Sequence, residues 1–254
     1  MIGCGAIGGA VVEALAALPA PRPELVAVLT RTPRPALPPG VSVTSLDALL
    51  AARPDVVMEC AGQAALLEHA PAILGAGLDL IASSIGALAD EGFADRLAAI
   101  GGPGRLVVAS GAVAALDGLA AARLIGIETV LYRQIAPVTS WRGHPLAPPA
   151  IEQPGTQRVF AGTAREAARL FPKNANVTAS VALAGIGFER TRVELVSDSA
   201  ATTTRHEIAA EGAFGTLRLE ISARPVAPGV RSSRLVAGSL LHAALRRDAA
   251  VVVA

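Results

Sequence analysis

The stretch Gly3-Cys4-Gly5-Ala6-Ile7-Gly8 has the spacing G-x-G-x-x-G and opens an Ala-rich run with helical periodicity. In such a motif the first glycine permits a tight turn, the second lets backbone approach a pyrophosphate, and the third packs helix against strand. The phosphates then meet the free N–H groups at the positive end of the helix. The motif therefore predicts a dinucleotide site formed by Gly3, Gly5, Ala6, Ile7 and Gly8.

Short apolar segments alternate with helical runs through the first hundred residues. The strand-like segments cover 25–30, 56–60, 78–83 and 106–110, and the helical runs include 7–18 and 63–76. Such alternation predicts βαβ units and a parallel sheet of the Rossmann type. Only Met1 and Ile2 precede the motif, where a central strand usually supplies about five residues. We expect a misassigned start codon or a trimmed chain, rather than a sheet that tolerates so short a strand.

The pattern changes after Ala112. A strand is expected over 127–134, followed by a loop with Trp141 and His144 and by helical runs over 164–170 and 172–184. Three β-rich stretches follow, over 191–197, 203–211 and 214–222, with a turn at Gly212-Ala213, and then a closing amphipathic helix over 231–247. This order predicts a smaller α+β domain with a mainly antiparallel sheet.

Composition excludes several classes of protein. The 254 residues carry a net charge of +1 with scattered arginines, so neither nucleic acid nor an anionic membrane surface is expected as a partner. The two cysteines and four histidines show no zinc-site spacing, and the apolar runs are too short or too interrupted to span a bilayer. We expect a soluble cytoplasmic protein without a metal.

The second expected strand ends in Leu29-Thr30-Arg31-Thr32, without the carboxylate that grips a ribose 2′-hydroxyl. An arginine there can pair with a 2′-phosphate and stack on adenine. Arg31 therefore predicts that NADP binds at least as well as NAD; the alternative is a solvated loop charge.

The only lysine and the only two asparagines of the chain lie together, at Lys173, Asn174 and Asn176. Pro172 suits the first position of a helix, so the three side chains are expected in its first turn. An ammonium, two amides and free N–H groups suit a carboxylate or a carboxamide. This fits a nicotinamide and an acidic substrate that meet between two domains; an ordinary helix cap is the alternative.

His206 is the histidine best placed for proton transfer. It follows Thr204 in a β-rich segment whose period of two puts both on one face, with Arg205 and Glu207 on the other. A hydrogen-bonded sheet histidine is the alternative, but dehydrogenases need a group that moves protons near pH 7. His144 is a second candidate.

Six pieces in order closely resemble the NAD(P)-dependent L-aspartate dehydrogenase family. They are GCGAIG (3–8), SSIGALAD (83–90), SGAVAALDGL (110–119), FPKNANV (171–177), ALAGIGFERT (182–191) and HEIAAEGAFG (206–215). The resemblance implies a homodimer that converts L-aspartate to iminosuccinate, then oxaloacetate and ammonia, often to supply NAD biosynthesis. It matches His206 to the catalytic histidine, and Ala112 and Asn176 to cofactor contacts. It also implies a nucleotide domain of residues 1–112 and 227–254 and a catalytic and dimerisation domain of residues 113–226.

On this basis we expect His206 to be the general acid/base and Asn176 to orient the nicotinamide. Lys173 has no such family match; its compact charge leads us to expect that it holds a substrate carboxylate. Three stretches depart from the family pattern: Thr204 where Asn is usual, 133–137, and 228–233. These departures leave open an imine reductase or a dehydrogenase of another amino acid, and a non-catalytic NADP-binding protein also remains an alternative.

Overall fold

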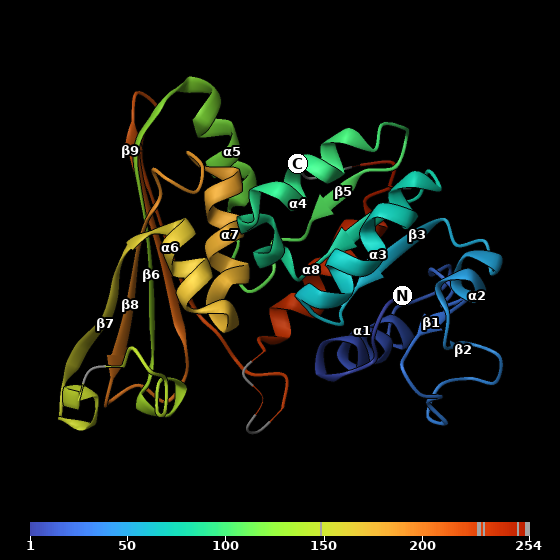
Figure 1. Cartoon of the computed structure of the whole chain (residues 1–254), viewed down its shortest axis with the longest axis horizontal. Coiled ribbons are helices and arrows are strands. Elements are labelled where there is room, and N and C mark those ends of the chain that lie inside the picture. Colours follow the sequence, from blue (N-terminus) through green and yellow to red (C-terminus); the bar gives the residue numbers. More distant parts are fainter. Residues whose placement is uncertain (148, 228–229, 231, 248, 252–254) are drawn as a thin grey trace. The chain divides into compact units, whose positions relative to one another are not determined.

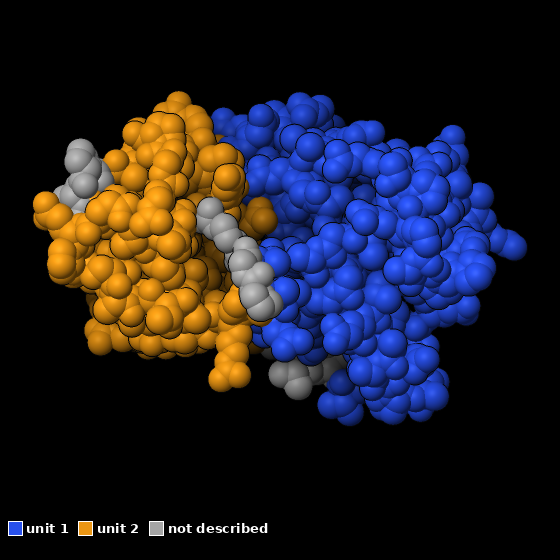
Figure 2. Space-filling model, turned by 90° about the horizontal axis from the view of Figure 1, so that it is seen from below, with its two compact units in different colours: residues 1–111, 226–254 blue, residues 112–225 orange. Residues whose placement is uncertain are grey.

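The structure, a computed structural model, describes residues 1–254 except 148, 228–229, 231, 248 and 252–254. It divides into unit 1, residues 1–111 and 226–254, and unit 2, residues 112–225 (Figure 2). Of the stretch 228–233 that departs from the family pattern, Pro228, Gly229 and Arg231 lie outside the described residues. No helix among the described residues is long and apolar enough to cross a membrane.

Unit 1 contains a parallel sheet. Strands β3, β4 and β5 pair in that order, and β1 pairs with β2. Ile2 joins the two groups, because it forms parallel bridges to Leu29 of β1 and Glu59 of β3. The two residues before the glycine motif thus occupy the central strand position. The strands are β1 (Val28–Leu29), β2 (Ser42–Val43), β3 (Val56–Glu59), β4 (Asp79–Ala82) and β5 (Leu106–Val108).

Helices connect these strands, which confirms the α/β prediction for this part of the chain. Polar N-caps fix several helix starts: the side chains of Ser45, Asp90 and Ser233 accept backbone N–H bonds at the starts of α2, α4 and α8. The helices are α1 (Ala6–Ala16), α2 (Leu46–Ala51), α3 (Gln63–Gly75), η1 (Ile85–Ala89), α4 (Glu91–Ala99) and α8 (Arg234–Leu245).

The closing helix α8 belongs to unit 1, far along the chain from the other elements of that unit. It contacts α1 and β4, and its apolar face includes the buried Leu240 and Leu241. Just after the end of α8, Arg247 forms an ion pair with the buried Asp79 of β4.

Unit 2 contains a five-stranded sheet in the order β10-β9-β6-β8-β7. The β6–β8 pair is parallel and the other three pairs are antiparallel, which confirms the predicted mainly antiparallel sheet. The edge strand β7 was not predicted. The strands are β6 (Ile127–Pro137), β7 (Thr156–Thr163), β8 (Arg192–Asp198), β9 (Arg205–Gly212) and β10 (Gly215–Ser222).

Three α-helices, α5 (Leu116–Ile125), α6 (Ala164–Leu170) and α7 (Ala175–Ala184), lie on one side of this sheet (Figure 1). The core includes Tyr132 and Leu195 from the strands and Ala179 and Ala182 from α7. Short 3-10 turns η2 (Val138–Ser140), η3 (Pro149–Glu152) and η4 (Pro172–Asn174) interrupt the connections.

Candidate functional site

The glycine motif of unit 1 forms a turn that excludes side chains at its first and third glycines. Gly3 has a φ of +83°, and a Cβ there would lie 2.7 Å from the Ala61 Cβ. A Cβ on Gly8 would lie 2.4 Å from the Gly3 carbonyl oxygen. Both distances are too short for real contacts, so the turn requires glycine at these two positions.

The middle glycine faces open space. Gly5 is the N-cap of α1, and a Cβ there would meet nothing within 4 Å. The first amides of a helix, here those after Gly5, have no carbonyl partner within that helix and carry its positive dipole end. The turn therefore fits a pyrophosphate, with room at Gly5 and donors from Ala6, Ile7 and Gly8.

Glu59, which sequence analysis missed, holds the loops after β3 and β4 together. This fully buried carboxylate accepts hydrogen bonds from the N–H groups of Ala61 (2.7 Å), Gly62 (2.8 Å) and Ser84 (3.0 Å). The Ser84 hydroxyl donates a fourth, at 2.9 Å. These loops follow the carboxyl ends of parallel strands, where ligands of open α/β sheets bind. A carboxylate ending an otherwise apolar strand was the available signal in the sequence.

Arg31 lies just after β1 and its side chain is exposed. The neighbouring Thr30 hydroxyl, by contrast, is tied down by a 2.9 Å bond to the Thr32 carbonyl. A guanidinium on an ordered turn and open to solvent can meet a phosphate of a bound nucleotide.

His206 lies on β9 and is only 6% exposed. Its register partner on β6 is Gln134, and Tyr132, two residues earlier on β6, faces the same side of the sheet. The Tyr132 Oη lies 2.8 Å from Nδ1 of His206, and the Tyr132 hydroxyl donates to Oε1 of Gln134 at 3.3 Å. The structure thus brings a histidine, a phenol and an amide into one buried hydrogen-bonded chain.

Burial sets the protonation states of His206 and Tyr132. It lowers the pKa of the His206 imidazole from its ordinary 6.5 to about 4, and it raises the pKa of the Tyr132 phenol above its ordinary range. Since desolvation disfavours charge on either ring, His206 is neutral near pH 7 and Tyr132 keeps its proton. A neutral imidazole is the form that can accept a proton.

The Lys173 cluster differs from its predicted form. Lys173 and Asn174 lie in the 3-10 turn η4, and α7 begins only at Ala175. Asn174 is the N-cap of α7, but its side chain makes no cap hydrogen bond. The expectation that all three side chains share the first α-helical turn is therefore wrong, and only Asn176 lies within it. Lys173 is exposed, whereas Asn174 and Asn176 are partly buried.

An aromatic cluster anchors the start of this turn. Phe171 is buried against Trp141 and Phe160, and the His144 ring stacks on it at 4.4 Å. The His144 Nδ1 accepts a 3.2 Å bond from the Leu146 N–H. These contacts give His144 a packing role.

Ala112 is buried and precedes Ala115, whose φ of +55° lies in the left-handed region. Left-handed backbone at a non-glycine residue persists where the surroundings impose it, and it is common at functional turns. The turn over 111–115 leads directly into α5.

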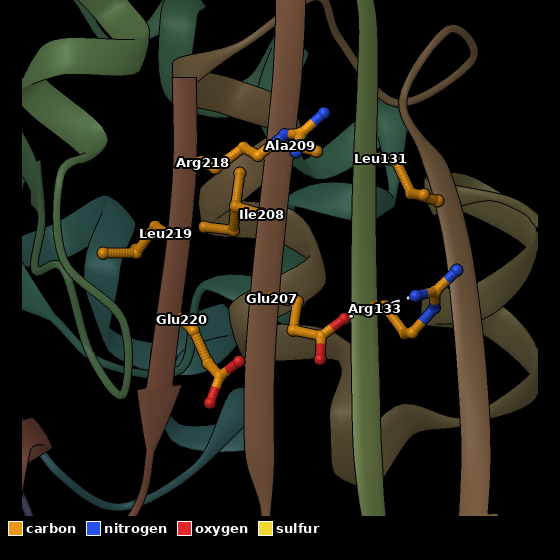
Figure 3. Close-up of a pocket in the computed structure, with 8 residues that line it drawn as sticks. All are labelled: Leu131, Arg133, Glu207, Ile208, Ala209, Arg218, Leu219 and Glu220. Carbon is orange, nitrogen blue, oxygen red and sulfur yellow. Dashed lines mark hydrogen bonds and ion pairs between the residues drawn. The ribbon is translucent and has the colours of Figure 1, made fainter. Parts of the chain in front are cut away.

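The sheet face opposite the helices carries a shallow pocket with charged walls (Figure 3). Arg133 donates to Glu194 at 2.7 Å and to Glu207 at 3.3 Å. Arg218 and Glu220 of β10 line the same pocket, as does the apolar Leu131 of β6. Charged and apolar side chains both lie on this face, whereas the face that holds His206 is buried.

Two family profiles match this chain. The family described as aspartate dehydrogenase, C-terminal, matches residues 117–247, and the NAD binding domain of homoserine dehydrogenase matches residues 3–100.

Relatives match over nearly the whole length. L-aspartate dehydrogenase 1 of Bordetella pertussis is 47% identical over 250 residues, covering 96% of this chain and 94% of that protein. L-aspartate dehydrogenase of Cupriavidus necator is 40% identical over 264 residues, covering 100% and 98%. The crystal structure of aspartate dehydrogenase from Thermotoga maritima superposes with a TM-score of 0.79 at 27% identity, covering 100% of this chain and 97% of that one.

Proposed function

This chain belongs to the aspartate dehydrogenase family, a family of nicotinamide-dependent amino acid dehydrogenases, and we propose that it oxidatively deaminates L-aspartate. The products are iminosuccinate and then oxaloacetate and ammonia, and the reverse reaction is a reductive amination. The similarity to L-aspartate dehydrogenases across both units carries this proposal.

The turn of Gly3, Gly5 and Gly8 would hold the pyrophosphate of the cofactor, with Ala112 a further contact. When bound, the nicotinamide supplies the acceptor for the hydride that leaves the α-carbon of aspartate. The space at Gly5 supports this assignment, because a side chain there would occupy it.

His206 is the proposed general base. After aspartate has become the imine, a water attacks the imine carbon while the Nε2 of His206 accepts a proton from that water. In the reverse direction the protonated ring returns the proton. Proton transfer by a positioned side chain contributes about 10²–10⁴-fold to a rate. The neutral state of the buried ring near pH 7 supports this role.

Lys173 and Asn176 are assigned to ligand positioning. The exposed ammonium of Lys173 can pair with a substrate carboxylate as a point charge. The Asn176 amide, which can donate and accept, can orient the carboxamide of the nicotinamide.

For the cofactor, we propose NADP as preferred or shared with NAD. The exposed Arg31 after β1 supports this choice, because its guanidinium can pair with a 2′-phosphate. A carboxylate in the same place would repel that phosphate.

A homodimer is also proposed. The charged sheet face of unit 2 supports it, because Arg218 and Glu220 of β10, on the same face as the intrachain pair of Arg133 and Glu207, can meet the same residues of a second copy. Light scattering during size-exclusion chromatography would measure the mass in solution. A monomer at micromolar concentration would contradict the dimer.

The substrate proposal is tested by mixing the protein with oxaloacetate, ammonia and NADPH and following the absorbance of the reduced cofactor. A panel of other oxo acids and amino acids belongs in the same experiment. Thr204 lies just before β9, at a position where the family usually carries Asn, and this departure makes a dehydrogenase of another amino acid the second candidate. Faster turnover of another oxo acid than of oxaloacetate would select that second candidate.

A further inference from the structure

A buried hydroxyl and a buried amide approach the side of His206 that the proposed reaction does not use. Among the described residues, the His206 ring makes its hydrogen bond through Nδ1, to Tyr132. Tyr132 is 0% exposed and Gln134 is 5% exposed, so water does not compete for these groups. The three side chains come from adjacent strands in fixed register, since Gln134 faces His206 directly.

The phenol has a single proton, and this proton decides which group donates in each hydrogen bond among Tyr132, Gln134 and His206. The Tyr132 hydroxyl donates to the Gln134 carbonyl oxygen, so it has no second proton for Nδ1. With the phenol proton directed at Gln134, we assign the ring proton to Nδ1, which lies 2.8 Å from the phenol oxygen and donates to it. The lone pair of the neutral ring is left on Nε2.

We propose that Tyr132 and Gln134 are positioning residues that hold neutral His206 in the Nδ1–H tautomer, with Nε2 free to accept a proton. When Nε2 takes the proton of the attacking water, the ring becomes an imidazolium and both ring nitrogens carry protons. The Nδ1–H bond to Tyr132, itself oriented by Gln134, then stabilises that cation with fixed dipoles inside a buried site. No proton leaves Nδ1, and the phenol stays neutral throughout.

This inference rests on the proposed role of His206, but its first test needs no substrate. Nitrogen NMR of the full chain labelled at histidine distinguishes a protonated ring nitrogen from an unprotonated one. We expect the His206 signals, identified by their loss in His206→Asn, to show Nδ1 protonated and Nε2 unprotonated at pH 7. A proton on Nε2 in the unsubstituted protein would overturn the proposal.

Three variants separate positioning from packing. Gln134→Leu removes the acceptor, so the phenol proton turns to Nδ1, the ring proton moves to Nε2, and kcat falls by about 10- to 100-fold with little change in cofactor affinity. Gln134→Glu keeps an acceptor and should keep the tautomer. Tyr132→Phe removes the partner of Nδ1 and should give a mixture of tautomers with a similar loss of kcat.

Ser197→Ala is the matched control. Ser197 lies on β8 of the same sheet, and the substitution removes its buried hydroxyl. That hydroxyl has no hydrogen-bond partner among the described residues. Tautomer and kcat should both stay unchanged in it.

If Gln134→Leu and Tyr132→Phe also leave both unchanged, the positioning role is wrong, whatever the fate of the substrate proposal. If the tautomers shift but no variant or parent turns over aspartate, the proposed function fails and the hydrogen-bonded chain stands. If Tyr132→Phe does not fold, Gln134→Leu against Gln134→Glu decides alone.

Discussion

The phenol oxygen of Tyr132 lies 2.8 Å from Nδ1 of His206, and the two rings are inclined by only 15°. The pair is buried on the helix-covered face of the unit 2 sheet, on the adjacent strands β6 and β9. An imidazole in this setting is neutral near pH 7 and is oriented by a partner that cannot itself ionise in the working range.

The pH dependence of activity follows from this burial. His206 acts as a base only when unprotonated, and burial puts its pKa at about 4 rather than 6.5. We therefore expect kcat/KM for aspartate oxidation to show no acidic limb near pH 6.5 from this group, and to fall only as pH drops toward about 4. A limb centred near 6.5 in the pH–rate profile would contradict a buried, neutral base.

The same shift predicts a change in stability. The unfolded chain binds a proton at this histidine below about 6.5, and the folded chain only below about 4, so the stabilisation is present above pH 6.5 and is lost as pH falls toward 4. Complete loss is worth about 3 kcal/mol. Urea unfolding at several pH values should show this slope in the parent protein and a smaller slope in His206→Gln.

The glycine turn predicts a sharp difference between neighbouring positions. Gly8→Ala places a Cβ 2.4 Å from the Gly3 carbonyl oxygen, so the turn must shift at a cost of about 1–3 kcal/mol, and cofactor affinity should fall at least tenfold. Gly9→Ala meets nothing within 4 Å and should bind cofactor normally, with equal or higher stability. Calorimetric titration with NADPH measures both; equal affinities would refute the assignment of this turn.

Arg31→Ala should weaken NADPH binding without weakening NADH binding. A charge-assisted hydrogen bond is worth about 1.5–3 kcal/mol, which corresponds to roughly a 10- to 100-fold rise in the dissociation constant. Arg34→Ala is the control, because Arg34 is exposed on the same loop. The selectivity claim fails if NADPH and NADH lose affinity equally, or if neither changes.

Lys173→Ala should raise KM for aspartate by about 10- to 100-fold while the dissociation constant for cofactor stays constant. Lys173→Arg keeps the charge and should recover part of the loss. Arg169→Ala serves as control, because it removes an exposed cation from the nearby α6. Initial rates against aspartate concentration give the result, and an unchanged KM in Lys173→Ala would remove this residue from substrate binding.

The sequence predicted the elements with strong periodicity closely. The expected helix over 63–76 is α3 at Gln63–Gly75, and the strand over 56–60 is β3 at Val56–Glu59. Local pattern decides such elements, because a buried strand is almost wholly apolar and a helix repeats every 3.6 residues.

The missed features depend on distant parts of the chain. Strand β7 lies at the sheet edge, starts after Gly155 and includes Gly162, so its local pattern resembles a loop. The chain of Tyr132, Gln134 and His206 depends on the register between β6 and β9, about seventy residues apart in sequence. A slip of one residue would turn Tyr132 and Gln134 to the opposite face, and only the assembled sheet fixes that register.

The most direct test of the account is the initial rate of NADPH oxidation with oxaloacetate and ammonia, measured for the parent protein and for His206→Ala. We predict clear turnover by the parent and at least a hundredfold lower rate in the variant, with NADPH affinity retained. A parent without turnover, or a variant as fast as the parent, would contradict the assignment of His206 as the base of an aspartate dehydrogenase.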